Sequence, residues 1–312
     1  MKILVTGGAG FIGSHIADAY VSEGHDVVVV DNLSTGKKEN VNDSVHFYEV
    51  DICDKEALKK VFVEEQIEVV NHQAAHASVP ESVKDPIHDL DVNIKGSVNL
   101  AELCKDYGVK KFIFASTGGA LYGDAEITPT PETYPAKPIS PYGVAKLSFE
   151  HYLHYYYTVF GLNYTVLRYA NVYGERQDPH GEAGVVAIFS KKIAGDEQPI
   201  IFGDGEQTRD YVYVGDVVEA SVSAFNKDAL NGAVNIGTGV ETSVNELFRH
   251  IVSVSGKEVS EKHADGREKE QRRSVLDYSQ AHELLAWGPE FVLGEKAGEE
   301  ALKKTYEFFA LQ

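Results

Sequence analysis

The chain has 312 residues and a formal net charge of −19 at pH 7, from 48 acidic and 29 basic side chains. This length buries a large hydrophobic core, so folding needs no disulfide or metal staples. The acidic balance argues against nucleic-acid binding, because such binding relies on basic residues that neutralise phosphates. No run of eighteen apolar residues is present, so we expect no membrane span. We also expect no metal site.

The cysteines and the N-terminus indicate the compartment. Cys53 and Cys104 are the two cysteines, and both lie in segments with a helical pattern. So few cysteines exclude a disulfide scaffold and favour a reducing environment. Met1 leads directly into an apolar strand pattern, with no leader segment to remove. We therefore expect a cytoplasmic protein.

The first half of the chain alternates between strand and helix patterns. The strand candidates are short β-branched or apolar runs, which are typical of strands buried on both faces. In chain order we expect strands at Ile3–Thr6, His25–Val30, Val45–Val50, Ile67–Asn71, Lys111–Ala115 and Tyr164–Arg168. We expect helices at Ser14–Ser22, Asp54–Glu65, Ile87–Tyr107 and Tyr142–Phe160. This alternation predicts an α/β fold with a doubly wound parallel sheet of the Rossmann type.

The alternation ends after Tyr169, where the chain becomes irregular. Residues 175–184 and 204–210 are polar, and residues 264–273 are densely charged. We therefore predict two units. Residues 1–170 form a Rossmann-type domain to which 214–236 return, and 171–312 form a smaller, discontinuous lobe.

Three glycines between the first strand and the first helix indicate a dinucleotide site. Gly7, Gly10 and Gly13 allow a tight turn, close approach of the backbone to a pyrophosphate, and contact between helix and strand. The helix N-terminus adds free N–H groups and a positive dipole. Asp31 ends the second strand, where a carboxylate accepts ribose hydroxyls and repels a 2′-phosphate. We therefore expect NAD rather than NADP, with its adenine near Asp51-Ile52.

A tyrosine and a lysine are spaced for catalysis on one helix. Tyr142 and Lys146 are four residues apart and so share a helical face. A free phenol has a pKa of about 10, and we expect the lysine ammonium and the nicotinamide cation to lower it. A third group should come from the strand that ends in Ser116-Thr117. Either hydroxyl can serve at this edge of the sheet.

These motifs, taken together, resemble the extended short-chain dehydrogenases/reductases that modify nucleotide-sugars, and most closely the UDP-glucose 4-epimerase family. The resemblance covers essentially the whole chain. The matching segments are Thr6–Gly13, Asp31–Ser34, Asn93 before Gly96, Ser116–Thr117 before Tyr122-Gly123, Tyr142–Lys146, Leu167–Gly174, Arg176–Gly184, Arg209–Asp216, and Arg267 with Arg272–Ser274.

The resemblance implies reversible epimerisation at C4 of a UDP-sugar, such as UDP-galactose and UDP-glucose, through a 4-keto intermediate. Tyr142, Lys146 and Thr117 would be catalytic. The residues implied to bind NAD are Gly7, Gly10, Phe11, Ile12, Gly13, Asp31, Asn32, Ser34, Gly36, Asp51, Ile52, Gln73, Ala74, Ala75, Asn93, Ser116, Tyr142, Lys146, Tyr169 and Val172. Those implied to bind the UDP-sugar are Thr117, Asn171, Val185, Ile200, Phe202, Arg209, Arg267, Glu270 and Ser274.

One residue departs from the family pattern. Many of these epimerases carry a catalytic serine four residues before the Tyr-Gly pair, where this chain has Gly118. We therefore expect Thr117 to take that role, with an extended turn through Gly118-Gly119. The absence of an Asp-Glu pair after Thr117 argues against a 4,6-dehydratase. A nucleotide-sugar decarboxylase or glucuronate epimerase stays open, and a non-catalytic NAD sensor would not need Tyr142 and Lys146.

The resemblance also bears on sugar scope and assembly. Stricter family members carry a tyrosine that crowds the sugar C2 substituent at the position of Ser274. We therefore expect N-acetylhexosamines to be accepted as well. The helices at 87–107 and 142–160 resemble those that pair across a two-fold axis, which implies a homodimer.

Overall fold

The computed structural model of this protein describes residues 1–179, 184–266 and 271–312. A parallel sheet of seven strands forms the larger part of the molecule, with the order β11-β6-β5-β4-β1-β2-β3. These strands are β1 (Lys2–Thr6), β2 (Asp26–Asp31), β3 (His46–Glu49), β4 (Val69–His72), β5 (Lys111–Thr117), β6 (Tyr164–Tyr169) and β11 (Gly232–Ile236). The order reverses between β1 and β4, so the carboxyl ends of these two strands flank a topological switch point. The predicted α/β class with a doubly wound parallel sheet is confirmed.

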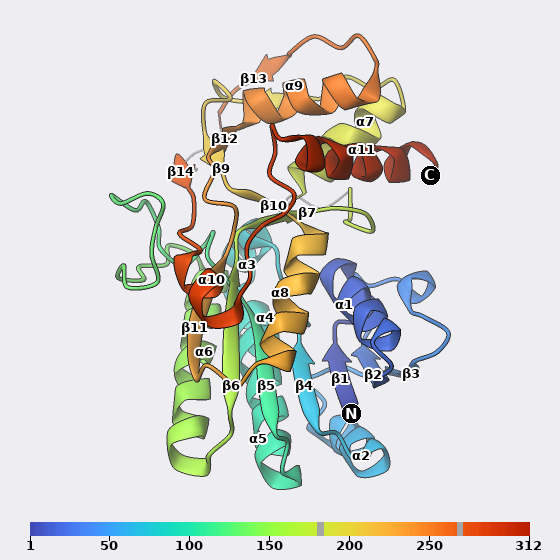
Figure 1. Cartoon of the computed structure of the whole chain (residues 1–312), viewed down its shortest axis with the longest axis vertical. Helices are drawn as coiled ribbons and strands as arrows, with labels where there is room; N and C mark the ends of the chain where they lie inside the picture. Colours follow the sequence, from blue (N-terminus) through green and yellow to red (C-terminus); the bar gives the residue numbers. More distant parts are fainter. Residues whose placement is uncertain (180–183, 267–270) are drawn as a thin grey trace.

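Helices cover both faces of this sheet (Figure 1). One face carries α2 (Lys55–Glu65), α5 (Ser97–Tyr107) and α6 (Pro141–Phe160). The other carries α1 (Phe11–Ser22) and α8 (Val214–Asn226), which pack against each other. Because both faces are covered, the central strands are largely apolar, as in Val27–Val30.

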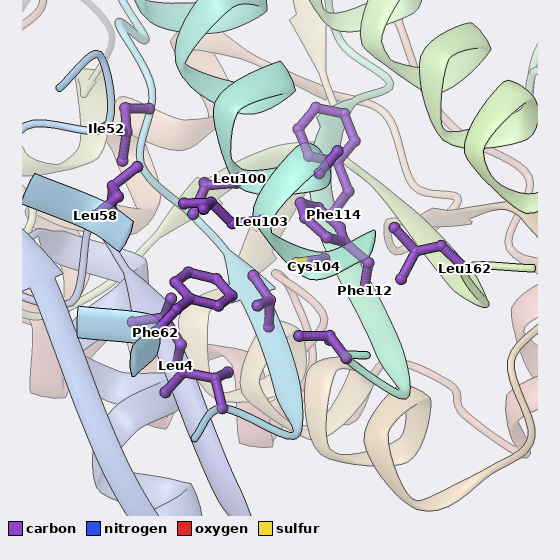
Figure 2. Close-up of a cluster of buried hydrophobic side chains, with 14 of the residues drawn as sticks. Leu4, Ile52, Leu58, Phe62, Leu100, Leu103, Cys104, Phe112, Phe114 and Leu162 are labelled. Atoms are coloured by element: carbon purple, nitrogen blue, oxygen red, sulfur yellow. The ribbon is translucent and has the colours of Figure 1, made fainter. Parts of the chain in front are cut away.

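The core between the sheet and α2, α5 and α6 is built from aliphatic and aromatic side chains. Figure 2 shows Leu4 of β1 and Phe112 of β5 on the same side of the sheet as Phe62 of α2 and Leu100 of α5. Each of these four side chains is at most 1% exposed. Burying one side chain of this kind stabilises the fold by about 1.5–3 kcal/mol.

The predicted helix at 87–107 is divided into three parts. It begins as α4 (Pro86–Leu90), passes through a π-helical turn at Asp91–Gly96, and continues as α5. A short α3 (Val79–Lys84) precedes it. Cys104 lies in α5, but Cys53 lies in a turn before α2, because Asp54 is the N-cap of that helix. The helical expectation for Cys53 is therefore wrong.

The predicted helix at 142–160 is a single element whose ends are set by local chemistry. Ser140 caps α6 by accepting a hydrogen bond from the Gly143 N–H, and Pro141 occupies the first turn. The helix ends at Gly161, whose φ of +75° lies in the left-handed region. Tyr142 and Lys146 thus lie in the first two turns, at the carboxyl edge of the sheet.

The smaller lobe lies beyond the carboxyl ends of the strands, at the top of Figure 1. Its core is formed by three helices, α7 (Val185–Ala194), α9 (Val244–Ser255) and α11 (Lys296–Ala310). Short strand pairs join distant segments. These pairs are β10 (Tyr211–Tyr213) with β7 (Asn171–Tyr173), β13 (His263–Ala264) with β8 (Ile201–Phe202), and β9 (Thr208–Arg209) with both β12 (Thr242–Ser243) and β14 (Arg273–Ser274).

The chain crosses between the two units more than once. Residues 214–236 supply α8 and β11 to the larger unit, and β11 pairs in parallel with β6. A further segment also packs there: α10 (Ser279–Leu285) contacts β11 and α8, and Trp287 lies in the same core. The sequence patterns gave no sign of this second return.

Candidate active site

The loop between β1 and α1 has the form of a dinucleotide cradle. Gly7 has a φ of +69°, and a Cβ added there would lie 2.7 Å from the Ala74 backbone nitrogen. A Cβ on Gly13 would lie 2.2 Å from the Gly7 carbonyl oxygen. Gly10 is the N-cap of α1 and supplies no side-chain cap, so the first N–H groups at Phe11 and Ile12 face outward. This loop fits a pyrophosphate.

Asp31 organises the edge of the site next to β2. Its two carboxylate oxygens accept hydrogen bonds from the N–H groups of Ala9, at 3.0 Å, and Leu33, at 2.8 Å. A Cβ on Gly36 would lie 2.8 Å from one of these oxygens. Asp31 therefore joins the glycine loop to the β2 loop, and each of its oxygens keeps a second lone pair for a ribose hydroxyl.

Asp51 and Ile52, predicted near the adenine, lie beside this edge together with Asn32 and Ser34, which the resemblance implies for NAD. Asn32 donates to the Asp51 carboxylate at 2.9 Å, and the Ser34 N–H donates to the Asn32 side chain. Asn32 and Ser34 are exposed, whereas Ile52 is buried against Gly96. The structure thus brings these predicted residues to one border of the glycine loop.

The predicted residues after β4 line the opposite border. Gln73 donates to the Tyr169 hydroxyl at 3.3 Å, which joins the ends of β4 and β6. Ala74 and Ala75 follow Gln73 and are half-buried, as is Val172 in β7. Asn93 is different: its side chain is buried and hydrogen-bonded to the backbone of His76 in both directions.

Tyr142, Lys146 and Thr117 meet at the carboxyl end of β5. The Thr117 side chain lies close enough to the Tyr142 phenol to lower its pKa. The Lys146 Nζ lies 5.8 Å from the centre of the Tyr142 ring and donates to the Ala115 carbonyl at 2.8 Å. Lys146 is only 3% exposed. The structure therefore brings the three predicted catalytic side chains together.

The electrostatics of this group differ from the sequence-based expectation. Burial raises the pKa of the Tyr142 phenol, Asp89 raises it further, and the nearby Thr117 side chain opposes the rise. Burial also lowers the pKa of Lys146 to about 7, although Asp89 and Glu150 act to raise it. The prediction that Lys146 lowers the pKa of Tyr142 is therefore not met by the polypeptide alone. The free-energy cost of burying a charged group there exceeds the gain from its interaction with neighbouring charges.

The two adjacent hydroxyls at the end of β5 point in different directions. The Ser116 hydroxyl is buried and donates to the Glu150 carboxylate at 2.5 Å. Glu150 also forms a buried ion pair with Arg168, with an N–O distance of 2.6 Å. The hydroxyl left to face Tyr142 is that of Thr117.

The turn at Gly118-Gly119 has a packing reason. A Cβ on Gly118 would lie 2.4 Å from a methyl carbon of Leu276, whose side chain is buried. A serine at this position would collide with that side chain. At Gly119 the nearest groups are the side chains of Asn171, Thr117 and Ser274, at 3.5, 3.9 and 4.0 Å from an added Cβ. Gly119 thus borders a space shared by three predicted substrate-binding residues.

The remaining substrate candidates lie on the smaller lobe. Ser274 of β14 pairs in register with Arg209 of β9, which places their backbones side by side. Val185 begins α7, Ile200 precedes β8, and Phe202 is 40% exposed. Arg267 and Glu270, which the resemblance also implies, lie outside the described residues.

Some residues beside the catalytic group were not predicted from the sequence. Asp89 is only 1% exposed and lies close enough to act on both Tyr142 and Lys146. The pair of Glu150 and Arg168 supports the strand end through Ser116. A carboxylate four residues after Lys146, on the same helical face, was the available signal for Glu150. Asp89 had no such signal.

Within the described ranges, no three His, Cys, Asp or Glu side chains gather as a metal site. In the same ranges, no helix combines the length and apolar character that crossing a bilayer requires.

Comparisons with known proteins agree with this geometry. A model of the NAD dependent epimerase/dehydratase family matches residues 3–237. A curated protein of Methanocaldococcus jannaschii, described as a putative UDP-glucose 4-epimerase, is 49% identical over 296 residues, which is 94% of this chain and 95% of that protein.

Two solved structures are similar over nearly the whole chain. The UDP-glucose 4-epimerase of Thermotoga maritima, crystallised with UDP-glucose, is 52% identical with a TM-score of 0.95 and covers 99% of this chain and 98% of its own. The UDP-glucose 4-epimerase of Thermus thermophilus, in complex with NAD, is 44% identical with a TM-score of 0.93 and covers 99% of both chains. The fold, the glycine cradle and these similarities together place the chain in the NAD dependent epimerase/dehydratase family.

Proposed function

We propose that this chain is a UDP-glucose 4-epimerase that interconverts UDP-galactose and UDP-glucose with bound NAD. The observation that carries the proposal is the group of Tyr142, Thr117 and Lys146 at the carboxyl end of β5, beside a glycine cradle for a dinucleotide. Relatives that match over nearly the whole chain carry this activity in their descriptions.

Tyr142 moves the proton at the sugar 4-hydroxyl. The glycine loop and Asp31 would hold NAD, which would supply the hydride acceptor and donor for the sugar C4 and a positive charge that favours the phenolate. The polypeptide alone opposes that phenolate. Thr117 holds the phenol and the reacting sugar oxygen in line, and Lys146 supplies a second cation from its buried position.

The residues of the smaller lobe hold the UDP part of the substrate. A guanidinium such as that of Arg209 is suited to a diphosphate because its planar fork donates several hydrogen bonds. Val185, Ile200 and Phe202 offer apolar surface for the uracil, with Arg267 and Glu270 completing the set. Asn171 and Ser274 border the space at Gly119 that faces the sugar.

We further propose that the protein acts as a cytoplasmic homodimer through α4 and α6, which pack against each other. Their outer surface exposes large apolar side chains, including Ile87 (68%), Val144 (48%) and Tyr155 (46%). Exposed apolar surface of this extent is typical of protein interfaces. Light scattering should give the mass of two chains, and of one chain after Ile87→Lys with Val144→Lys.

Incubation of the purified protein with UDP-galactose tests the activity. We expect UDP-glucose to form without added NADH, because the net redox change is zero. A panel with UDP-N-acetylhexosamines and UDP-glucuronate then defines the sugar. A protein that binds NAD but converts none of them would be a sensor, and the proposal would be wrong.

A further inference from the structure

A buried carboxylate lies where distant segments of the chain meet between the two units. Asp210 stands between β9 and β10 and is only 1% exposed. Its Oδ1 accepts hydrogen bonds from the Thr238 N–H, at 2.8 Å, and from the Thr238 hydroxyl, at 2.7 Å. Its Oδ2 accepts from the N–H groups of Gly239 and Leu276, both at 3.2 Å. This side chain has no role in the mechanism proposed above.

The site of this side chain is shaped for a carboxylate. A Cβ on Gly237 would lie 2.4 Å from the Asp210 Oδ2, so the chain needs glycine to pass so close. The Thr238 hydroxyl accepts from the Val240 N–H at 3.2 Å, which leaves its own proton for Asp210. All four bonds to Asp210 therefore come from donors, and the two oxygens of a carboxylate offer acceptor sites for all of them. An amide of the same shape cannot accept at its nitrogen.

The segments that Asp210 joins carry predicted substrate residues. Asp210 follows Arg209 directly, and its backbone carbonyl accepts from the Asn171 N–H at 2.9 Å. Leu276, bonded to the carboxylate, comes shortly after Ser274, whose strand pairs in register with Arg209. Three of the side chains predicted to hold the UDP-sugar thus depend on backbone that Asp210 or its bonded partners fix in place.

The bond to Leu276 also reaches the turn beside the sugar. The Leu276 side chain is buried, and a Cβ on Gly118 would lie 2.4 Å from one of its methyl carbons. The next residue, Gly119, borders the side chains of Asn171 and Ser274. Because protein interiors are closely packed, a shift of the Leu276 backbone would be transmitted to this space.

We propose that Asp210 is a positioning residue for the substrate: by tying the chain after β11 and after β14 to the strand that carries Arg209, it sets the spacing between the diphosphate contact and the sugar contacts. The inference rests on the proposed function, and it assigns Asp210 no contact with substrate or NAD. The catalytic group is held in another way. Tyr142 and Lys146 lie on α6, and Thr117 pairs in register with Tyr169 of β6.

The test compares Asp210→Asn with the unmodified protein. If the asparagine oxygen stays with Thr238, its amide nitrogen faces the N–H groups of Gly239 and Leu276, and both of those hydrogen bonds are lost. KM for UDP-galactose should rise about tenfold, the loss that one misplaced hydrogen bond to the substrate causes, while kcat changes little. Calorimetry should show a similar loss of affinity for UDP. The NAD content, measured on dinucleotide released by denaturation, should not change.

The matched control is Asp216→Asn. Asp216 is buried as well, and its carboxylate also accepts backbone hydrogen bonds, from Glu290 and Phe291. Neither of these partners belongs to the predicted substrate set. If KM reflected only the loss of a buried, hydrogen-bonded aspartate, it would rise in both variants. We expect it to rise in Asp210→Asn alone.

A milder pair of variants serves if Asp210→Asn does not fold. Thr238→Val keeps the shape of the side chain but removes its hydrogen bond to Oδ1, and Thr238→Ser keeps that hydrogen bond. KM for UDP-galactose should rise in Thr238→Val and stay near the unmodified value in Thr238→Ser. The opposite order would show that packing at this position matters and that the bond to Asp210 does not.

The outcomes separate the two proposals. An unmodified protein that binds UDP but converts no UDP-sugar contradicts the proposed function, and the UDP affinity of the variants still tests Asp210. An unmodified protein that does not bind UDP contradicts both. If the unmodified protein converts UDP-galactose and Asp210→Asn keeps its KM and its UDP affinity, the role of Asp210 is wrong. A fall in NAD content together with kcat would also overturn it, because the effect would then not be confined to the substrate.

Discussion

The proposed catalytic edge, where Tyr142, Lys146 and Thr117 meet at the carboxyl end of β5, and the smaller lobe are built in contrasting ways. Tyr142 and Lys146 lie on a helix of 20 residues, and Thr117 ends a strand of seven. The substrate candidates Arg209 and Ser274 lie on strands of two residues, paired although they are 65 positions apart in the chain. Rigid elements hold reacting groups to narrow tolerances, while short strands and loops let specificity vary. The following predictions probe this division.

The largest effect is expected at the catalytic edge. Tyr142→Phe removes the group that we propose exchanges a proton with the sugar 4-hydroxyl. The rate of epimerisation should fall by roughly 10²-fold or more, the usual contribution of a general base. UDP should bind as before, because its predicted contacts lie on the other lobe. Single-turnover kinetics measures the rate of epimerisation, and calorimetry measures the affinity for UDP. A loss of both would contradict the separation of catalysis from UDP binding.

A change on the smaller lobe should alter selectivity instead. Ser274 is buried and lies within reach of the space at Gly119. Ser274→Tyr fills the space that a C2 N-acetyl group requires. We expect turnover of UDP-N-acetylhexosamines to be abolished and that of UDP-galactose to be spared. Competition between the two substrates in one assay measures this directly. An equal loss of both would refute the assignment of sugar scope to Ser274.

The turn at Gly118-Gly119, which lies against residues of both regions, offers a matched pair of variants. Gly118→Ala meets the buried Leu276 side chain, so it should destabilise the protein by about 1–3 kcal/mol, as overpacking does. Gly119→Ala has ordinary packing space. It should leave the unfolding midpoint unchanged and raise KM, because its methyl group enters the predicted sugar space. Urea unfolding and steady-state kinetics on both variants test this. If Gly118→Ala raised KM and Gly119→Ala lowered stability, the sugar would lie elsewhere.

The last expected effect appears only when the pH is changed, and it lies where α8 meets the segment at Glu290-Phe291. Asp216 of α8 accepts hydrogen bonds from the N–H groups of Glu290 and Phe291. Burial raises the pKa of this carboxyl to about 6, and the two hydrogen bonds only partly oppose the rise. Because the pKa of Asp216 is higher in the folded than in the unfolded state, the folded protein favours the protonated carboxyl. The contribution of this group to the free energy of unfolding is therefore lost as pH rises from about 4 through about 6.

The corresponding measurement compares Asp216→Asn with the unmodified protein by urea unfolding at pH 4.5 and pH 7. The unmodified protein should lose about 2 kcal/mol more than the variant over this interval. Identical pH dependence of the two proteins would show that Asp216 does not titrate at this contact.

Much of the larger unit was predictable because its information is local. Apolar runs such as Val27–Val30 mark buried strands, and the glycines from Gly7 to Gly13 mark a turn that side chains would obstruct. The spacing of Tyr142 and Lys146 follows from the helical repeat. In these cases, residues close in the sequence decide the structure, so periodicity and spacing are enough to predict it.

Other features were decided only by the tertiary structure. The electrostatics around Tyr142 depend on Asp89, 53 positions earlier in the chain, and on burial that no local pattern specifies. The choice of Thr117 over Ser116 depends on Glu150, which captures the serine hydroxyl. Gly118 is required by Leu276, which the chain brings back after crossing the smaller lobe. The amino-acid sequence by itself therefore determined the sheet, the glycine turn and the shared helical face of Tyr142 and Lys146. The charges and contacts that tune this pair come from distant segments, and only folding brings them within reach.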